Sequence, residues 1–438
     1  MNVPAGGKKM GLFMATMLVT VNMVGTGIFL LPVSMASVGS ISIWGWVVAT
    51  IGAGAIGLMY ALLGALDPQP GGPYAYARSS LGPYLGFQTN YVYWSANLLG
   101  NIAVATTVTG YFTEFIPALK IPAVGISCSV LWVWLATAIN IAGPRFVGTL
   151  TSWCTVFAAV PLILIGGLGW FWFDPTIFTA SWNPSGMSGL DAVSKSAAFA
   201  FWAFIGVESA SVSAGVIENP KRNVPAATML GLVISAVLYI SVCTVLMGVI
   251  PAAELAKSDA PIAIAVAKAI GPVGGLVVAV CAILKSFAAL TGWTLTISQS
   301  AHAAAADGMF PGLFRRLNSK GIPVTNLLIA GVLMSLVVIA TASGSLAEQF
   351  DNLIDMAIVL TLLPYLYTVV AFLKVSRTAG IRGAGRIAVG LVAGSACLYC
   401  LWAIAGSDAD LVRDAMIVLF FSIPLFTFFA RGLETRAA

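Results

Sequence analysis

The sequence predicts an all-α polytopic membrane protein. Of its 438 residues, 59% are hydrophobic and only 8% are charged, whereas a soluble domain carries roughly 25% charged residues. Long apolar segments follow one another along the chain, and two of them are interrupted by small and polar residues. Lipid offers no hydrogen-bond partners, so backbone that crosses it is expected to be helical.

A helix that spans the bilayer needs about 20 mostly apolar residues. Twelve segments meet this requirement, and residues 1–438 are expected to form a single transmembrane domain. The expected spans are 11–31, 42–65, 84–116, 124–142, 148–172, 193–216, 224–250, 273–303, 325–344, 349–373, 385–405 and 412–431.

The distribution of Lys and Arg predicts the orientation of these spans. With the N-terminus in the cytoplasm, fifteen of the 21 Lys and Arg residues fall in inside loops and tails and five fall outside. Short inside loops are enriched in Lys and Arg. Both termini are therefore expected in the cytoplasm, and no cleaved signal peptide is expected after Lys8 and Lys9.

The first and sixth spans break at mid-depth, over Val21–Ile28 and Trp202–Ser209. Irregular backbone persists in a membrane only where it lines a site or a water-filled cavity. Two interrupted spans far apart in one chain are typical of the substrate site of a secondary transporter. Residues 11–172 and 193–373 are expected to be a five-plus-five inverted repeat, with two extra helices in 385–431.

Composition argues against other classes of protein. All six cysteines fall in apolar segments, and His302 is the only histidine. The sequence therefore predicts no metal site, no cofactor and no enzyme activity. The net charge of +5 comes from short loops without interleaved aromatic residues, so no nucleic-acid partner is expected. A channel, a membrane enzyme and a receptor are the remaining, disfavoured classes.

Several strings resemble the amino acid–polyamine–organocation superfamily. Within it, they are similar to the bacterial basic amino acid/diamine antiporters and closest to the arginine/agmatine branch. The strings span 22–27, 71–77, 202–211, 218–225 and 292–293.

Gly25, Thr26 and Gly27 are expected to unwind the first span. Freed N–H groups and the dipole of the following half-helix can hold a carboxylate. The resemblance assigns this stretch to the substrate carboxylate and the backbone carbonyls of Ile205 to Val207 to its amino group. The alternative is close helix packing by small residues.

Glu208 is an acid at mid-membrane, where a charged side chain costs about 2.5–3.5 kcal/mol even on mild scales. It is a candidate proton sensor, the role that the resemblance implies, or else a structural carboxylate. Trp202 and Trp293 are candidate aromatic walls, since a cation over an indole gains roughly 0.5–2 kcal/mol. The alternative for both is ordinary packing.

Asn22, Asn97 and Asn101 are amides at mid-membrane that can offer acceptors to a cationic group or join helices to one another. Tyr93 and Tyr365, with Trp202, are candidate gating residues. The full set expected to bind substrate is Asn22, Gly25, Thr26, Gly27, Ala96, Asn97, Asn101, Trp202, Ile205, Trp293 and Ala357.

The chain departs from the arginine/agmatine branch at three of these positions. That branch has Ser where this chain has Thr26, Cys where it has Asn97, and Ser where it has Ala357. The lysine/cadaverine branch has Asn at the position of Asn97, as this chain does. Lys285 and Asp355 are charges that the resemblance does not predict. We expect an ion pair between them, because neither should be unpaired in lipid; the alternative is that Lys285 takes part in proton coupling.

The resemblance implies exchange of external arginine for internal agmatine by alternating access, contributing to acid resistance. The alternatives are a lysine/cadaverine or ornithine/putrescine exchanger and a proton-coupled amino acid uptake permease. It also implies a homodimer through the last two spans, lipid as the surrounding partner, and a place in the bacterial inner membrane.

Overall fold

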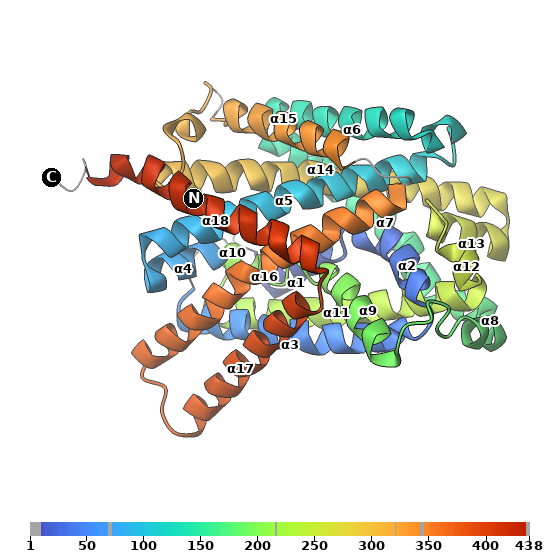
Figure 1. Cartoon of the computed structure of the whole chain (residues 1–438), viewed down its shortest axis with the longest axis horizontal. Helices are drawn as coiled ribbons and strands as arrows, with labels where there is room; N and C mark the ends of the chain where they lie inside the picture. Colours follow the sequence, from blue (N-terminus) through green and yellow to red (C-terminus); the bar gives the residue numbers. More distant parts are fainter. Residues whose placement is uncertain (1–9, 69–71, 215–216, 320, 342–345, 435–438) are drawn as a thin grey trace.

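The computed structural model describes residues 10–68, 72–214, 217–319, 321–341 and 346–434, and it is helical throughout (Figure 1). Within these residues the only β-type pairing is an isolated bridge between Met10 and Ile217. The all-α prediction is therefore confirmed. Both termini lie outside the described residues, so their expected cytoplasmic location stays a prediction.

The helices fall into long elements and short connecting ones. The long helices are α3 (Ser42–Leu66), α5 (Pro83–Phe112), α6 (Pro122–Ala142), α7 (Pro144–Leu168), α11 (Pro220–Val249), α14 (Pro272–Ala306), α15 (Val324–Ala340), α16 (Leu346–Thr378), α17 (Ala384–Ala405) and α18 (Ala409–Glu434). The shorter α-helices are α1 (Leu12–Met23), α2 (Gly27–Val38), α4 (Pro73–Leu81), α8 (Pro175–Ala180), α9 (Gly189–Trp202), α10 (Ser209–Val212), α12 (Ala252–Leu255) and α13 (Pro261–Ile270). Single 3₁₀ turns are η1 (Pro117–Lys120), η2 (Gly169–Trp172) and η4 (Gly312–Arg315).

Each of the twelve expected spans coincides with a helix or with a broken pair of helices. Among the described residues, seven helices are long and apolar enough to cross a membrane, and the bent pair α1 and α2 makes an eighth candidate. The four others are α5, α7, α9 and α15. In α5 the buried polar residues Asn90, Asn101 and Thr106 lower the hydropathy because that helix lies inside the bundle. The number of twelve spans therefore stays a prediction.

Proline marks the first turn of many of these helices. A proline at this position costs no hydrogen bond, because the first N–H groups of a helix have no partner within it. Before α14, Gly271 has φ +97°, a conformation that favours glycine, and Pro272 then starts the helix. The helices that begin in this way are α4, α5, α6, α7, α8, α11, α13 and α14.

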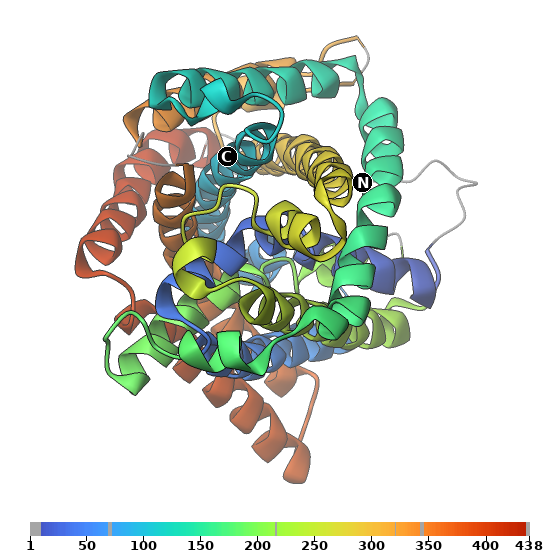
Figure 2. The same cartoon turned by 90° about the vertical axis from the view of Figure 1, so that its right-hand side faces the viewer.

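Two groups of packed helices surround the interrupted ones. Helix α5 packs against α14 and α16, and α3 packs against α11 and α9. The half-helix α1 lies along α11, and α2 lies against α9 and α11. Figure 2 looks along many of these helices and shows the bundle end-on, with α17 projecting from it. The interrupted helices thus lie inside the bundle rather than at its edge.

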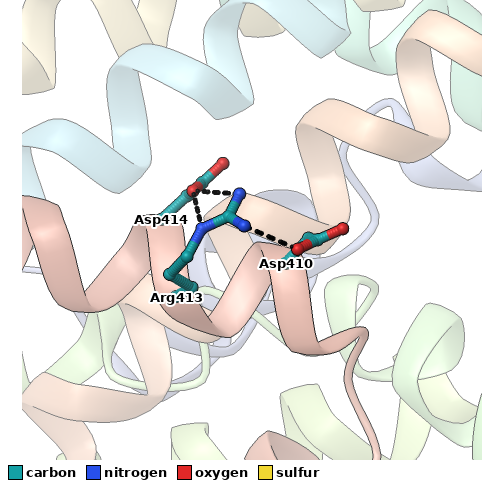
Figure 3. A network of polar contacts seen from close by, with 3 residues as sticks. All are labelled: Asp410, Arg413 and Asp414. Carbon is teal, nitrogen blue, oxygen red and sulfur yellow. Dashed lines mark hydrogen bonds and ion pairs between the residues drawn. The ribbon is translucent and has the colours of Figure 1, made fainter.

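The outer helices present apolar side chains to their surroundings. Only 11% of the apolar window of α18 is buried, and Phe157 on α7 and Leu398 on α17 are 58% and 69% exposed. Such faces suit contact with lipid. At the start of α18, Arg413 bridges Asp410 and Asp414 (Figure 3). These three side chains are well exposed, so water screens the ion pairs and they contribute little to stability.

Glycines set the distance between α1 and α11. A Cβ added at Gly231 of α11 would lie 2.6 Å from Cγ1 of Val19, whereas one added at Gly54 of α3 would meet nothing within 4 Å.

We expect Gly231→Ala to push α1 away and to destabilise the fold by about 1–3 kcal/mol, the usual cost of overpacking. Thermal unfolding in detergent measures this cost. Gly54→Ala is the matched control and should unfold at or above the wild-type temperature; equal behaviour of the two variants would contradict the close packing of α1 on α11.

Candidate functional site

The first interruption separates α1 from α2. Helix α1 ends at Met23, α2 starts at Gly27, and the two axes differ by 44°. No side chain caps the N-terminus of α2. The hydroxyl of Tyr239 donates to the Met23 carbonyl oxygen at 3.1 Å, which satisfies one of the acceptors that the break releases. The uncapped N–H groups and the positive end of the α2 dipole point to a place for an anion.

The second interruption follows α9. That helix ends at Trp202, and irregular turns lead to α10 at Ser209. Gly206 has φ +106°, which a residue with a Cβ rarely adopts. Among the described residues, the carbonyls of Ala203, Ile205 and Val207 accept no backbone hydrogen bond. Of these three residues, Ile205 lines the small cavity described below, so its carbonyl can accept from a ligand.

The two interruptions lie against each other. The side-chain amide of Asn22 donates to the Ser209 hydroxyl at 2.8 Å. A Cβ at Gly206 would lie 3.3 Å from the carbonyl carbon and oxygen of Asn22. Segments more than 180 residues apart thus meet at one point, and Gly206 allows the close approach. The two predicted breaks thus lie side by side, and their role as a substrate site stays a prediction.

A cavity of about 50 Å³ lies at this meeting point. Ten of the eleven residues expected to bind substrate line it; whether they bind a substrate stays a prediction. The lining residues are Asn22, Met23, Gly25, Thr26, Gly27, Ala96, Asn97, Gly100, Asn101, Val104, Trp202, Ile205, Tyr239, Trp293 and Thr361.

Ala357 is the expected residue that does not line the cavity. Its side chain is fully buried, and Thr361, one turn further along α16, lines the cavity instead. The Thr361 hydroxyl donates to the Ala357 carbonyl oxygen at 2.7 Å. One helical turn thus decides which residue of α16 faces the cavity, and a substrate contact of Ala357 stays a prediction.

The amides of α5 provide polar groups on the cavity wall. Asn97 donates to the Tyr93 carbonyl oxygen at 2.7 Å, and Asn101 donates to the Thr294 hydroxyl at 3.2 Å. Asn101 is 1% exposed, and its Oδ1 atom has no hydrogen-bond partner among the described residues. A buried acceptor without a partner is costly unless a ligand or water supplies the donor.

Trp202 closes part of the cavity. Its indole lies against two glycines, because a Cβ at Gly27 or Gly100 would fall within 3 Å of the ring. Trp293, on α14, lines the cavity from another side. Small residues on α2 and α5 therefore make the space that the Trp202 ring occupies.

Glu208 is 1% exposed and lies beside the cavity. Its Oε2 atom accepts hydrogen bonds from Tyr365 at 2.7 Å and from the Gly206 amide at 3.2 Å. Tyr93 donates to its Oε1 atom at 3.4 Å. The two tyrosines that the sequence identified as candidate gating residues thus both contact this carboxyl group, one from α5 and one from α16.

A second cavity of about 600 Å³ adjoins the first. Asn22, Gly25 and Trp293 line both, so the larger cavity leads from the small one. Its walls continue past Glu208 and Lys285 to Met10 at the N-terminal end of α1.

Lys285 and Asp355 do not come together. The ion pairs between described residues do not include one between these two side chains. Lys285, which is 5% exposed, lines the large cavity and lies near Cys154 of α7. Asp355 lies near Asp351 and Lys195 instead. The predicted pair fails because the two helices turn these residues toward different neighbours.

Other residues of the cavity carried no signal in the sequence. Tyr239 lies in an apolar helix, and its position at the first break became evident only from the packing of α11. Ser209 and Thr294, which accept from Asn22 and Asn101, are hydroxyls among many in this chain. Gly100 could have been found from its place between Asn97 and Asn101 on one helix face.

Comparison with known proteins agrees with this geometry. The amino acid permease family matches residues 10–429. The chain is 36% identical over 435 residues to a cadaverine/lysine antiporter of Escherichia coli strain K12, covering 98% of this chain and 96% of the relative. It is 34% identical over 435 residues to the putrescine transporter PotE of Haemophilus influenzae, covering 99% of both chains, and 34% identical to PotE of Escherichia coli strain K12, covering 99% and 98%. This chain therefore belongs to the amino acid permease family, within the amino acid–polyamine–organocation superfamily.

Proposed function

We propose that this protein is an antiporter that exchanges a basic amino acid for its decarboxylated diamine, with lysine and cadaverine as the pair. Relatives whose names state cadaverine/lysine and putrescine transport support this pair over arginine and agmatine. Asn97, which the lysine/cadaverine branch shares, supports it as well. Ornithine and putrescine are the nearest alternative.

The polar ends of the cavity suit an amino acid backbone. The uncapped N-terminus of α2, beside Gly25 and Thr26, fits the carboxylate. The carbonyl of Ile205 fits the α-ammonium group. A diamine has the ammonium group but no carboxylate, so it would leave the α2 terminus unoccupied. This difference between the two substrates would affect mainly the first interruption.

The observation that carries the proposal is the Oδ1 atom of Asn101, which has no hydrogen-bond partner in the described part of the chain. It lies on the wall of a cavity that contains no Asp or Glu, next to Asn97. A side-chain ammonium group is a donor that would satisfy this acceptor, and both lysine and cadaverine carry one. Trp293, on the wall of the same cavity, could add a cation–π contact.

Exchange would proceed by alternating access, with the interrupted helices moving against the helices around them. The 600 Å³ cavity connects the site with the N-terminal end of α1, which is the cytoplasmic side if the predicted orientation holds. Glu208 lies within the second break, where it accepts from Gly206, and its neighbour in the chain, Ser209, accepts from Asn22 at the first break. Its charge could thus be coupled to the opening of the site.

Lysine carries one net positive charge near neutral pH and cadaverine carries two. One turn of exchange that imports lysine and exports cadaverine would remove one positive charge from the cell. Together with a cytoplasmic decarboxylation that consumes a proton, this cycle would raise the internal pH and support acid resistance. We place the protein in a bacterial inner membrane as a homodimer, with the apolar faces of α17 and α18 available for contact.

Uptake of radiolabelled lysine into proteoliposomes tests the exchange. Vesicles preloaded with lysine or cadaverine should take up lysine rapidly, whereas empty vesicles should not, because an obligatory exchanger needs an internal substrate. Preloading with putrescine, agmatine or arginine measures the preference between pairs. Faster uptake with agmatine would restore the arginine/agmatine pair. Equal uptake into empty vesicles under an inward proton gradient would replace exchange with proton-coupled uptake.

Asn101 can be tested by pairing a variant with a modified substrate. In Asn101→Leu the acceptor is lost, and a hydrogen bond to a charged group contributes about 1.5–3 kcal/mol. Lysine affinity should therefore fall by roughly 10- to 150-fold. Norleucine, which lacks the terminal ammonium group, is the control, and its weak inhibition should be unaffected. An equal loss for both compounds would show that Asn101 does not contact that group.

Glu208→Gln tests the proton-sensing role. Glutamine keeps the length of the side chain and the acceptor for Tyr365 but cannot ionise. We expect the dependence of exchange on pH between acidic and neutral conditions to flatten, with folding retained. Glu254→Gln, at an exposed glutamate paired with Lys268, is the matched control and should keep the wild-type profile. A wild-type profile in Glu208→Gln would leave Glu208 with a structural role only.

A further inference from the structure

A separate cavity of about 190 Å³ lies where α16 ends and α17 begins. It shares no lining residue with the two cavities of the transport site. Helix α16 stops at Thr378, a tight turn follows, and α17 starts at Ala384. The cavity is lined by Leu373, Ser376, Arg377, Ile381, Arg386, Val389 and Gly390.

The charge of this cavity is entirely positive. Arg377 comes from the last turn of α16 and Arg386 from the first turn of α17. Neither takes part in an ion pair within the part of the chain that the structure describes. No carboxylate is among the lining residues. Two guanidinium groups on one cavity, without a carboxylate of the protein, suit an anion with several oxygen atoms.

Ser376 points to the same chemistry independently. Its side chain is 3% exposed, and its Oγ atom has no hydrogen-bond partner among the described residues. A buried hydroxyl is normally hydrogen-bonded, so an unpartnered one on a cavity wall indicates a missing ligand or water. A hydroxyl donates well to a phosphate oxygen, and the two arginines would supply the charge.

The start of α17 adds a third contribution. This helix has 22 residues, and no side chain caps its N-terminus at Gly383. The unpaired N–H groups and the positive end of the helix dipole favour an anion there. The first turn also carries Arg386, so the backbone and a side chain at this helix end both favour a negatively charged ligand.

We propose that this cavity binds a phosphate ester, supplied by the headgroup of an anionic phospholipid. The polar residues form one part of the wall, and Leu373, Ile381 and Val389 form an apolar part that suits the glycerol and upper acyl region. Basic cavities between membrane helices at the bilayer surface recognise anionic headgroups in this way. A bound headgroup would tie the end of α16, the helix that carries Thr361 and Tyr365, to α17. The proposal does not depend on which substrate the protein exchanges.

Native mass spectrometry of the full-length protein in detergent tests this site. Delipidated protein is titrated with phosphatidylglycerol, phosphatidylcholine or inorganic phosphate. Wild-type protein should retain one phosphatidylglycerol more tightly than any phosphatidylcholine. In Arg377→Gln/Arg386→Gln this molecule should bind at least roughly tenfold more weakly, because two charge-assisted contacts are lost. Ser376→Ala should weaken binding less, since the lost hydrogen bond comes from a neutral group.

Arg315→Gln/Arg316→Gln is the matched control. It removes the same charge from another short loop, where both arginines are exposed, and it should keep the tightly bound lipid. The thermal stability of lipid-free variants separates a lost site from a lost fold. Equal binding of the two phospholipids by wild-type protein, or equal losses in both double variants, would overturn the proposal. Binding of inorganic phosphate with the affinity of the lipid would overturn the lipid source.

Discussion

Two stretches of backbone that leave the regular α-helical hydrogen-bond pattern lie inside a bundle that lipid surrounds. Each unsatisfied N–H or C=O group there costs several kcal/mol, so the breaks need local turn bonds, such as Val207 N–H to the Phe204 carbonyl at 3.2 Å, and polar side chains around them. Asn22 donates to Ser209, Tyr239 donates to Met23, and the Gly206 amide donates to Glu208. Thr26, Gly27 and Ile205 line the small cavity. The position of the site follows from this constraint.

The helices around the interruptions hold the site in shape. Helices α5 and α16 pack against each other over much of their length, and they bring Tyr93 and Tyr365 to opposite oxygens of Glu208. The carboxyl group therefore links two helices, although it lies in irregular backbone. A change in its charge would alter its hydrogen bonds to the second break and to both of these helices.

Charges on the cavity walls of this protein mark places where something other than lipid is expected. Glu208 and Lys285 line the large cavity, and Arg377 and Arg386 line the cavity between α16 and α17. The lipid-facing surfaces, by contrast, are apolar along α7, α17 and α18. Exposed ion pairs such as those of Arg413 lie at a helix end, where water screens them. A position on a cavity wall thus distinguishes these four charges from those that only mark the membrane surface.

The sequence by itself determined the helical class, the positions of the two breaks and most of the residues around them. The reason is local: long apolar segments must be helices in lipid, and glycine with polar neighbours at mid-span predicts a break. Only the tertiary structure decided which residues face the cavity. On α16, Thr361 lines the small cavity, whereas Ala357, one turn earlier, does not. The rotation of α14 and α16 turns the side chains of Lys285 and Asp355 toward different neighbours. Which residues of a helix face a cavity depends on the rotation of that helix and on its packing against distant segments. The spacing of residues along the chain does not encode either.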